Sequence, residues 1–303
     1  MVFGVMRARR KPQVSSLLLS GLSLMLLLGF AIISIYPIYH VYLYAFNDGM
    51  DSYKAPLYLW PRQFTISNIV IALQENEIMR AFLISLARTS VGTLCSCFLT
   101  ASLAYALTKT KLPGHGIFST YFFITYIFNG GFIAFFLTIR QLGLYNNFLV
   151  YVIPGLYNYW YMIIIRSFFQ TIPASVEESA EIDGASYITI FLRLILPLSK
   201  PVLAAIALFT AIGHWNDWFS GTFYVSSGKL LPLQTVLQQM ITQTDMLQKM
   251  VTMGGNLSEY LTGVTPNSIR MAVVVITVTP IIVIYPFLQR YFIKGIMIGA
   301  IKG

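Results

Sequence analysis

The sequence predicts an all-α, polytopic membrane protein with six transmembrane helices, and three observations lead to this fold class. The chain of 303 residues is 56% hydrophobic and only 10% charged, with a mean hydropathy of +0.70. Too little polar surface is present to cover a soluble domain, so a bilayer is the expected solvent. The sequence contains several apolar runs of about 20 residues each, the length of helix that crosses a hydrocarbon core of about 30 Å. Basic residues collect beside these runs, as at the cytoplasmic ends of membrane helices.

The six spans follow one another without a domain boundary. The first is too long for the apolar core of a signal peptide and lacks a small-residue cleavage pattern, so it is expected to remain as an anchor. The predicted spans lie near residues 17–38, 81–107, 117–139, 149–165, 202–219 and 271–288. We therefore expect a cytoplasmic segment over 1–16, a single transmembrane domain over 17–293 and a cytoplasmic tail over 294–303. In the third span Gly130 and Gly131 allow a local break or close helix packing, and close packing is the expected role.

The positions of the basic residues predict the orientation and place the chain in the cell membrane. With the first residues inside, twelve of the twenty Lys and Arg residues fall on the cytoplasmic side. They are Arg7, Arg9, Arg10, Lys11, Lys109, Lys111, Arg166, Arg193, Lys200, Arg290, Lys294 and Lys302. The excess of Lys and Arg over the eleven Asp and Glu is thus expected to set topology, and nucleic acid is not an expected partner. Both termini are expected in the cytoplasm.

Two loops on the predicted outer side contain helical patterns. In the loop from residue 47 to 80, Ser67 is a possible N-cap of a short helix that runs to Leu73. In the loop from residue 220 to 270, apolar residues at helical spacing between Pro232 and Gly254 predict an amphipathic helix. Packing of this helix on the spans and a role in ligand binding are both open.

A segment rich in carboxylates, Glu177 to Pro201, follows the fourth span on the predicted cytoplasmic side. Pro173 can open a helix there, and acidic residues in its first turns are stabilised by the helix macrodipole. Asp183 and Gly184 supply a turn, after which residues 185–194 can form a second helix. Its apolar stripe is expected to contain Ile188, Phe191, Leu192 and Ile195. Pro197 and Pro201 then redirect the chain. Two short helices with a glycine corner form a knob that is suited to docking on another protein.

The spacing of Glu178, Ala180, Asp183, Gly184, Leu196 and Pro197 resembles the EAA loop of ABC importer permeases. Two positions depart from that pattern, since Ser179 replaces an Ala and Leu194 stands where Ile is usual. The stretch from Trp215 to Phe219 and the closing residues from Ser268 are similar to the LplC-like branch of carbohydrate-uptake permeases. The similarity covers most of the chain.

The resemblance implies a function in transport. A permease of this kind pairs with a second, related permease, two ATPase subunits bind beneath, and an extracellular solute-binding protein delivers an oligosaccharide. The loop over 171–200 would transmit ATPase motion to the membrane helices. The implied coupling residues are Glu178, Ala180, Glu181, Asp183, Gly184, Leu196 and Pro197. This chain would have no catalytic site and bind no cofactor itself, because ATP and magnesium belong to the ATPase subunits.

A second group of residues is a candidate for the substrate path. It comprises Trp215, Asn216, Asp217 and Trp218 at the end of the fifth span, together with Arg88 in the second. An ionisable residue at membrane depth usually faces a bundle interior or a water-filled cavity. The alternative is an aromatic belt at the outer headgroups, with Asp217 in water. For Arg88, snorkelling or structural pairing is favoured over a role in the path.

Several other functions lack their sequence signatures. The lysine at Lys229 is followed by Leu230 and not by Ser or Thr, so no phosphate-binding loop is present. Neither a zinc-protease nor a serine-hydrolase motif occurs. Cys95 and Cys97 are expected to be packing residues, and no metal site is expected. A secondary, ion-coupled sugar transporter is the main alternative, but the internal repeats and ion ligands typical of that class are not visible.

Overall fold

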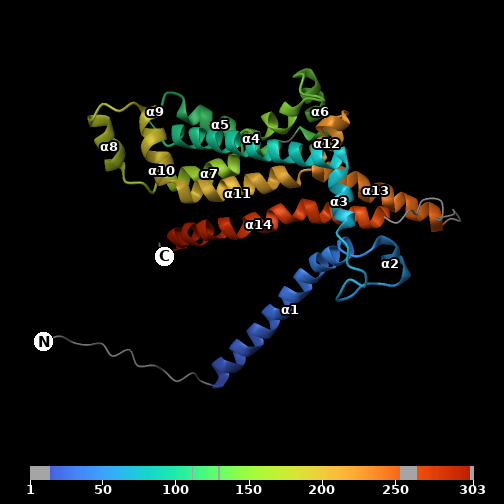
Figure 1. Ribbon diagram of the computed structural model, residues 1–303. Coiled ribbons are helices and arrows are strands. Elements are labelled where there is room, and N and C mark those ends of the chain that lie inside the picture. Colours follow the sequence, from blue (N-terminus) through green and yellow to red (C-terminus); the bar gives the residue numbers. More distant parts are fainter. Residues whose placement is uncertain (1–13, 111, 129, 253–264, 301–303) are drawn as a thin grey trace.

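The computed structural model describes residues 14–300 except 111, 129 and 253–264 (Figure 1). The long helices are α1 (Val14–Ala45), α4 (Asn76–Ala106), α11 (Lys200–Asn216), α13 (Leu233–Thr252) and α14 (Pro266–Ala300). Shorter α-helices are α2 (Gly49–Lys54), α3 (Ser67–Gln74), α5 (His115–Ile127), α6 (Gly131–Gln141), α7 (Tyr159–Phe169), α8 (Ala174–Ile182), α9 (Tyr187–Ile190), α10 (Leu196–Leu198) and α12 (Phe219–Tyr224). The 3₁₀ turns are η1 (Phe148–Tyr151), η2 (Ile153–Gly155) and η4 (Gly228–Leu230), and η3 (Phe191–Ile195) is a π turn. No strand occurs in the described residues, so the all-α prediction is confirmed.

The bundle is built around α4 and α11, which pack along each other (Figure 1). Helix α7 packs on α4, and α14 packs on the other side of α11. Helix α1 contacts α14 but diverges from the rest of the bundle, and its apolar side chains are largely exposed. The beginning of α1 and the end of α14 lie toward the end of the molecule where α8 lies (Figure 1). In a bilayer, exposed apolar surface of this kind contacts lipid or another membrane subunit.

Among the residues that the structure describes, three helices are long and apolar enough to cross a membrane: Leu19–Ala45, Asn76–Ala106 and Pro266–Pro286. Three further spans result if bent pairs are each counted once, which gives the predicted six. The pairs are His115–Ile127 with Gly131–Gln141 at 117°, Phe148–Gly155 with Tyr159–Phe169 at 49°, and Tyr187–Leu198 with Lys200–Asn216 at 82°. The predicted span near 117–139 is therefore not one continuous helix. Gly131 has a φ of 79°, which glycine adopts without strain, so the chain breaks here instead of packing closely as expected.

Buried residues form separate clusters at the two ends of the bundle. One cluster joins α4, α7 and α11 to the segment around α9 and η3, and Ile165 and Ile190 are completely buried in it. A second cluster joins α3 and α4 to α13 and α14. Complete burial of a side chain of this size stabilises a fold by about 1.5–3 kcal/mol. The first cluster therefore fixes the acidic segment firmly to α4, α7 and α11.

The two loops predicted on the outer side are partly as expected. Helix α13 confirms the amphipathic helix, since Leu233 and Leu237 are buried in the second cluster. Helix α3 begins at Ser67, but its N-cap is Ile66 and no side chain caps it, so the predicted cap at Ser67 is wrong. The preceding loop is held by Asp51, whose carboxylate accepts from the guanidinium of Arg62 at 2.9 Å.

Candidate functional site

The acidic segment forms an elbow at one end of the molecule; we call residues 171–200 the elbow segment. Helix α8 begins directly after Pro173 and ends before Asp183, as the sequence predicts. Gly184 has a φ of 80°, and the amide of Ala185 donates to the carbonyl of Ala180 at 2.9 Å. This arrangement is typical of a helix closed by a left-handed residue, which is why glycine is needed at the corner. The chain then turns into α9.

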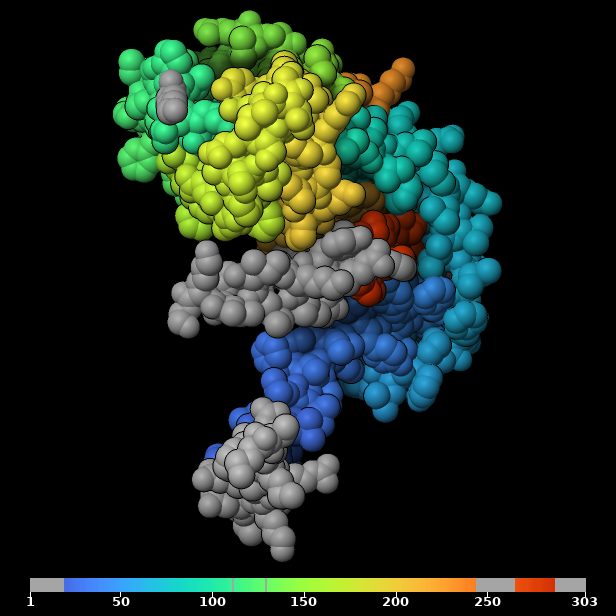
Figure 2. Space-filling view, turned by 90° about the vertical axis from the view of Figure 1, so that its left-hand side faces the viewer, coloured from blue at the N-terminus to red at the C-terminus, as the bar shows by residue number. Residues whose placement is uncertain are grey.

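The outward face of the elbow segment combines charge with exposed apolar side chains. Glu178, Glu181 and Asp183 are exposed, while Ala180 is half-buried against the core. Ile182 is 86% exposed and Ile188 is 72% exposed, which is unusual for isoleucine outside a membrane. Figure 2 views the molecule from this end, and the olive and yellow elbow segment forms its projecting front. A face of this composition is suited to binding a protein partner.

The second half of the elbow segment differs from the predicted stripe. Phe191 and Ile195 are buried, but Ile188 and Leu192 are exposed, and Ile190 is buried instead. The π turn η3 changes the register of the helix here, so the regular spacing of an α-helix does not hold. Leu196 is half-buried and Pro197 exposed, and the chain bends by 82° into α11.

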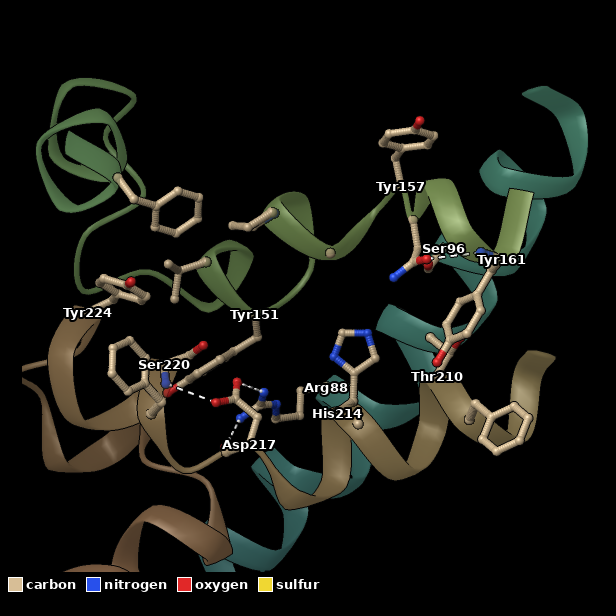
Figure 3. A pocket seen from close by; sticks show the side chains of 18 residues that line it. Arg88, Ser96, Tyr151, Tyr157, Tyr161, Thr210, His214, Asp217, Ser220 and Tyr224 are labelled. Atoms are coloured by element: carbon tan, nitrogen blue, oxygen red, sulfur yellow. Dashed lines mark hydrogen bonds and ion pairs between the residues drawn. The ribbon is translucent and has the colours of Figure 1, made fainter. Parts of the chain in front are cut away.

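A cavity of about 480 Å³ lies between α4, α7, α11, α12 and the turns η1 and η2 (Figure 3). Its wall combines aromatic rings with hydroxyl, amide and imidazole groups. The polar lining includes Arg88, Ser96, Tyr151, Tyr157, Asn158, Tyr161, Thr210, His214, Asp217, Ser220 and Tyr224, and the apolar rings are Phe135, Phe209 and Phe219. Its lining residues on α4 and α11 lie away from Ala106 and Lys200, the helix ends next to the elbow segment and Lys109.

Arg88 and Asp217 form an ion pair in the cavity wall (Figure 3). The guanidinium of Arg88 donates to the carboxylate and, at 2.9 Å, to the backbone carbonyl of Asp217. It also lies 4.4 Å from the centre of the Tyr151 ring. The side chain of Arg88 is 1% exposed, so the snorkelling interpretation is wrong and structural pairing is what the structure shows. The amide of Ser220 donates to the other carboxylate oxygen at 3.0 Å.

His214 is a cavity residue that directly precedes the predicted path residues in the sequence but was not predicted to line the path itself. Its imidazole points from α11 into the cavity (Figure 3) and lies between two glycines, Gly92 on α4 and Gly155 on η2. A Cβ atom at Gly92 would lie 2.6 Å from two ring atoms of His214, and one at Gly155 would lie 3.4 Å away. The two glycines therefore make room for the ring. Asp217 and His214 are three residues apart, a spacing that puts side chains on one helical face and could have identified the histidine.

The other predicted path residues do not line this cavity. Trp215 is buried on the side of α11 that faces α14, where its indole N–H donates to the carbonyl of Thr277 at 3.0 Å. Its ring meets Phe82 edge to face. Asn216 and Trp218 are exposed. The structure thus brings Asp217 and Arg88 together and places the three neighbouring residues elsewhere. In the described part of the chain, no three His, Cys, Asp or Glu residues are grouped as a metal site would require.

Comparisons with known proteins identify the family. Residues 99–298 match the family described as "Binding-protein-dependent transport system inner membrane component". The chain is 35% identical over 276 residues to protein LplC of Bacillus subtilis (strain 168), which covers 91% of this chain and 92% of LplC. It is 34% identical over 279 residues to the polygalacturonan/rhamnogalacturonan transport system permease protein YtcP of the same organism, which covers 91% of this chain and 96% of YtcP.

A solved structure agrees with these relatives. It is the crystal structure of a bacterial ABC transporter involved in the import of the acidic polysaccharide alginate. One of its chains matches with a TM-score of 0.83 at 28% identity, over 93% of this chain and 99% of that one. Permease subunits of this family are transport components without catalytic activity of their own, and they are not secondary transporters. The chain belongs to the family of inner membrane components of binding-protein-dependent transport systems, the permeases of ABC importers.

Proposed function

We propose that this permease imports an oligosaccharide and that its cavity is part of the substrate path. The observation that carries the proposal is the lining of the cavity, where the rings of Tyr151, Tyr161 and Phe209 accompany hydroxyl, amide and imidazole groups. Sugars place their C–H faces on aromatic rings and their hydroxyls on such polar groups. The Arg88–Asp217 pair keeps the charged part of the wall neutral overall. The printed names of YtcP and of the alginate importer, both of which act on polysaccharides, support a saccharide substrate.

The elbow segment is the proposed docking site for an ATPase subunit. Its exposed carboxylates Glu178, Glu181 and Asp183 can meet basic residues, and Ile182 and Ile188 supply apolar contact area. A docked apolar side chain surrounded by charge is the arrangement that concentrates binding energy in a few residues. ATP and magnesium would be bound by the ATPase subunits, so this chain itself holds no cofactor.

The remaining partners follow from the same arrangement. A second permease would cover part of the apolar surface that α1 exposes where it diverges from the bundle, and lipid would cover the rest. The start of α1 and the end of α14 lie toward the same end of the molecule as the elbow segment. If the elbow segment faces the cytoplasm, both termini would be on the cytoplasmic side of the cell membrane. A solute-binding protein would then deliver the oligosaccharide from outside, at the end that carries α2, α3 and α13.

To test this proposal, the chain is expressed together with a second, related permease and candidate ATPase subunits, and the complex is purified in mild detergent. We expect the ATPase to remain bound, and proteoliposomes loaded with ATP to accumulate an oligosaccharide only when a binding protein is present. Sugar uptake driven by an ion gradient without any ATPase would contradict the proposal. Uptake of a substrate other than a saccharide would contradict its substrate class alone.

A single methyl group at Gly92 is expected to impair transport through the cavity. Gly92→Ala places a Cβ atom 2.6 Å from the His214 ring, so the imidazole must leave its position between α4 and η2. We expect the uptake rate to fall by about tenfold, as when a well-placed binding group is lost. Gly116→Ala in α5 is the matched control, because nothing lies within 4 Å of its added Cβ. Equal uptake by the two variants would show that the His214 position is unimportant.

A further inference from the structure

One carboxylate of the elbow segment is paired within the chain and does not face a partner protein. Glu177 forms an ion pair with Lys109, which lies in the connection after α4. The side chains are only 21% and 28% exposed, whereas the neighbouring Glu178 points outward. The ammonium of Lys109 also lies 4.9 Å from the centre of the Tyr105 ring and 5.6 Å from that of Tyr187. Lys109 thus contacts α4, α8 and α9 at once.

The position of Lys109 relative to α4 is well defined. Its amide donates to the carbonyl of Ala106 at 3.1 Å, and the hydroxyl of Thr108 donates to the carbonyl of Tyr105 at 2.6 Å. These bonds continue the last turn of α4, so Lys109 extends the helix end and has little freedom to move against it. Displacement of Glu177 would therefore displace the end of α4 through Lys109.

An aromatic stack lies beneath the ion pair. The Tyr105 ring is stacked on Phe191 with centroids 5.2 Å apart and meets Phe169 edge to face at 6.3 Å. All three rings belong to the buried cluster that joins α4, α7 and the elbow segment. Packed rings of this kind resist compression, while the ion pair above them resists separation. The ion pair thus ties α8 to the end of α4, and the rings pack the later part of the elbow segment against the same helix end.

The surroundings of Lys109 favour its charged form. Burial alone would lower the pKa of Lys109, but the bond with Glu177 and the neighbouring groups outweigh it and leave the pKa above the usual value. Because the pair is only partly exposed, salt screens it less than an ordinary surface pair. Lys109 is therefore a cation near neutral pH.

We propose that Lys109 and Glu177 form an internal joint that passes movement of the elbow segment to the cavity through α4. This inference rests on the proposed function, because it assumes that the ATPase moves the elbow segment. Tyr105 and Arg88 are 17 residues apart on the same helix, which corresponds to about 25 Å. Motion at Lys109 would thus reach the Arg88–Asp217 pair by way of one continuous helix. Glu177 and Lys109 are positioning residues, whereas Glu178 is the residue proposed to contact the ATPase subunit.

The test compares Glu177→Gln and Lys109→Gln with Glu178→Gln in the assembled complex. Three quantities are measured for each: the amount of ATPase retained, the rate of ATP hydrolysis, and the oligosaccharide taken up per ATP in proteoliposomes. For Glu177→Gln and Lys109→Gln we expect full retention of the ATPase and a drop of about tenfold in uptake per ATP. Glu178→Gln is expected to reduce retention itself. Lys109→Arg keeps the charge and should restore most of the uptake per ATP.

The controls separate this inference from a merely structural role and from the proposed function. Lys54→Gln removes an exposed lysine on α2 and should change none of the three quantities. A structural role would lower the melting temperature of the complex without changing uptake per ATP. Loss of the ATPase from the Glu177→Gln complex would overturn the inference that Lys109 and Glu177 form an internal joint. Unchanged uptake per ATP in both Glu177→Gln and Lys109→Gln would also overturn it. Absence of the ATPase from the unmodified complex would instead overturn the proposed function.

Discussion

The variant Glu178→Lys is expected to hydrolyse ATP without importing substrate, or to lose the ATPase entirely. Glu178 is exposed on the outward face of α8, beside Ile182 and Glu181, where a docked subunit would bury it. Reversal of a charge at the centre of an interface leaves two like charges together, and such changes reduce binding by about 2 kcal/mol or more. The fold should be unaffected, because Glu178 has no partner in the buried cluster. The measurement is oligosaccharide uptake and ATP hydrolysis by the same proteoliposomes.

A second variant tests the position of this face instead of its charge. Gly184→Val has free space around it, since nothing lies within 4 Å of an added Cβ, but the φ of 80° strains a branched residue by about 1–2 kcal/mol. The corner should open and tilt α8, and uptake should fall as for Glu178→Lys. Glu75→Gln, an exposed carboxylate before α4, is the control. Normal uptake by both elbow variants would contradict the docking assignment.

Arg88→Met is expected to destabilise the permease strongly. The substitution leaves the carboxylate of Asp217, a side chain that is 28% exposed, without its cation. Loss of one partner of a buried ion pair typically costs about 3–5 kcal/mol. The variant should therefore accumulate poorly in the membrane and unfold at a markedly lower temperature in detergent. Asp217→Asn should have a similar effect, because it leaves the guanidinium unpaired.

The double variant Arg88→Met with Asp217→Leu distinguishes stability from transport. Replacing both charges by apolar groups removes the unpaired charge, so stability should return at least in part. Uptake should stay low, because the polar part of the cavity wall is lost. Arg140→Met, which removes an exposed arginine on α6, is the control and should keep its melting temperature. A single variant with an unchanged melting temperature would show that the pair contributes little.

The elbow segment was largely predictable because its shape is determined locally. Pro173 before the first helix, Gly184 at the corner and Pro197 at the bend act through their own backbone preferences, and the structure has each where it was expected. The π turn was not predictable from the spacing of apolar residues, and its residues Phe191 and Ile195 are buried in the first cluster. The ion pair of Lys109 with Glu177 joins residues 68 apart, and no local pattern specifies it.

The cavity was predictable in part. Arg88 and Asp217 were identifiable because ionisable residues in apolar segments are costly and therefore few. Their mutual pairing, over 129 residues, is a tertiary contact. Trp215 was grouped with Asp217 because they are close in sequence. Successive residues on a helix are about 100° apart, so positions 215 and 217 face nearly opposite sides. Trp215 consequently packs on α14, while Asp217, beyond the end of α11, faces Arg88.

The most direct test of the account places a photo-activated cross-linking amino acid at position 178 in the assembled transporter. Position 58, in the loop between α2 and α3 at the other end of the molecule, serves as the control, because Tyr58 is 65% exposed. Illumination in the absence of nucleotide, with ATP bound and during turnover should cross-link position 178 to the ATPase in at least one state, and position 58 in none. Absence of an ATPase product from position 178 in every state would contradict the central claim.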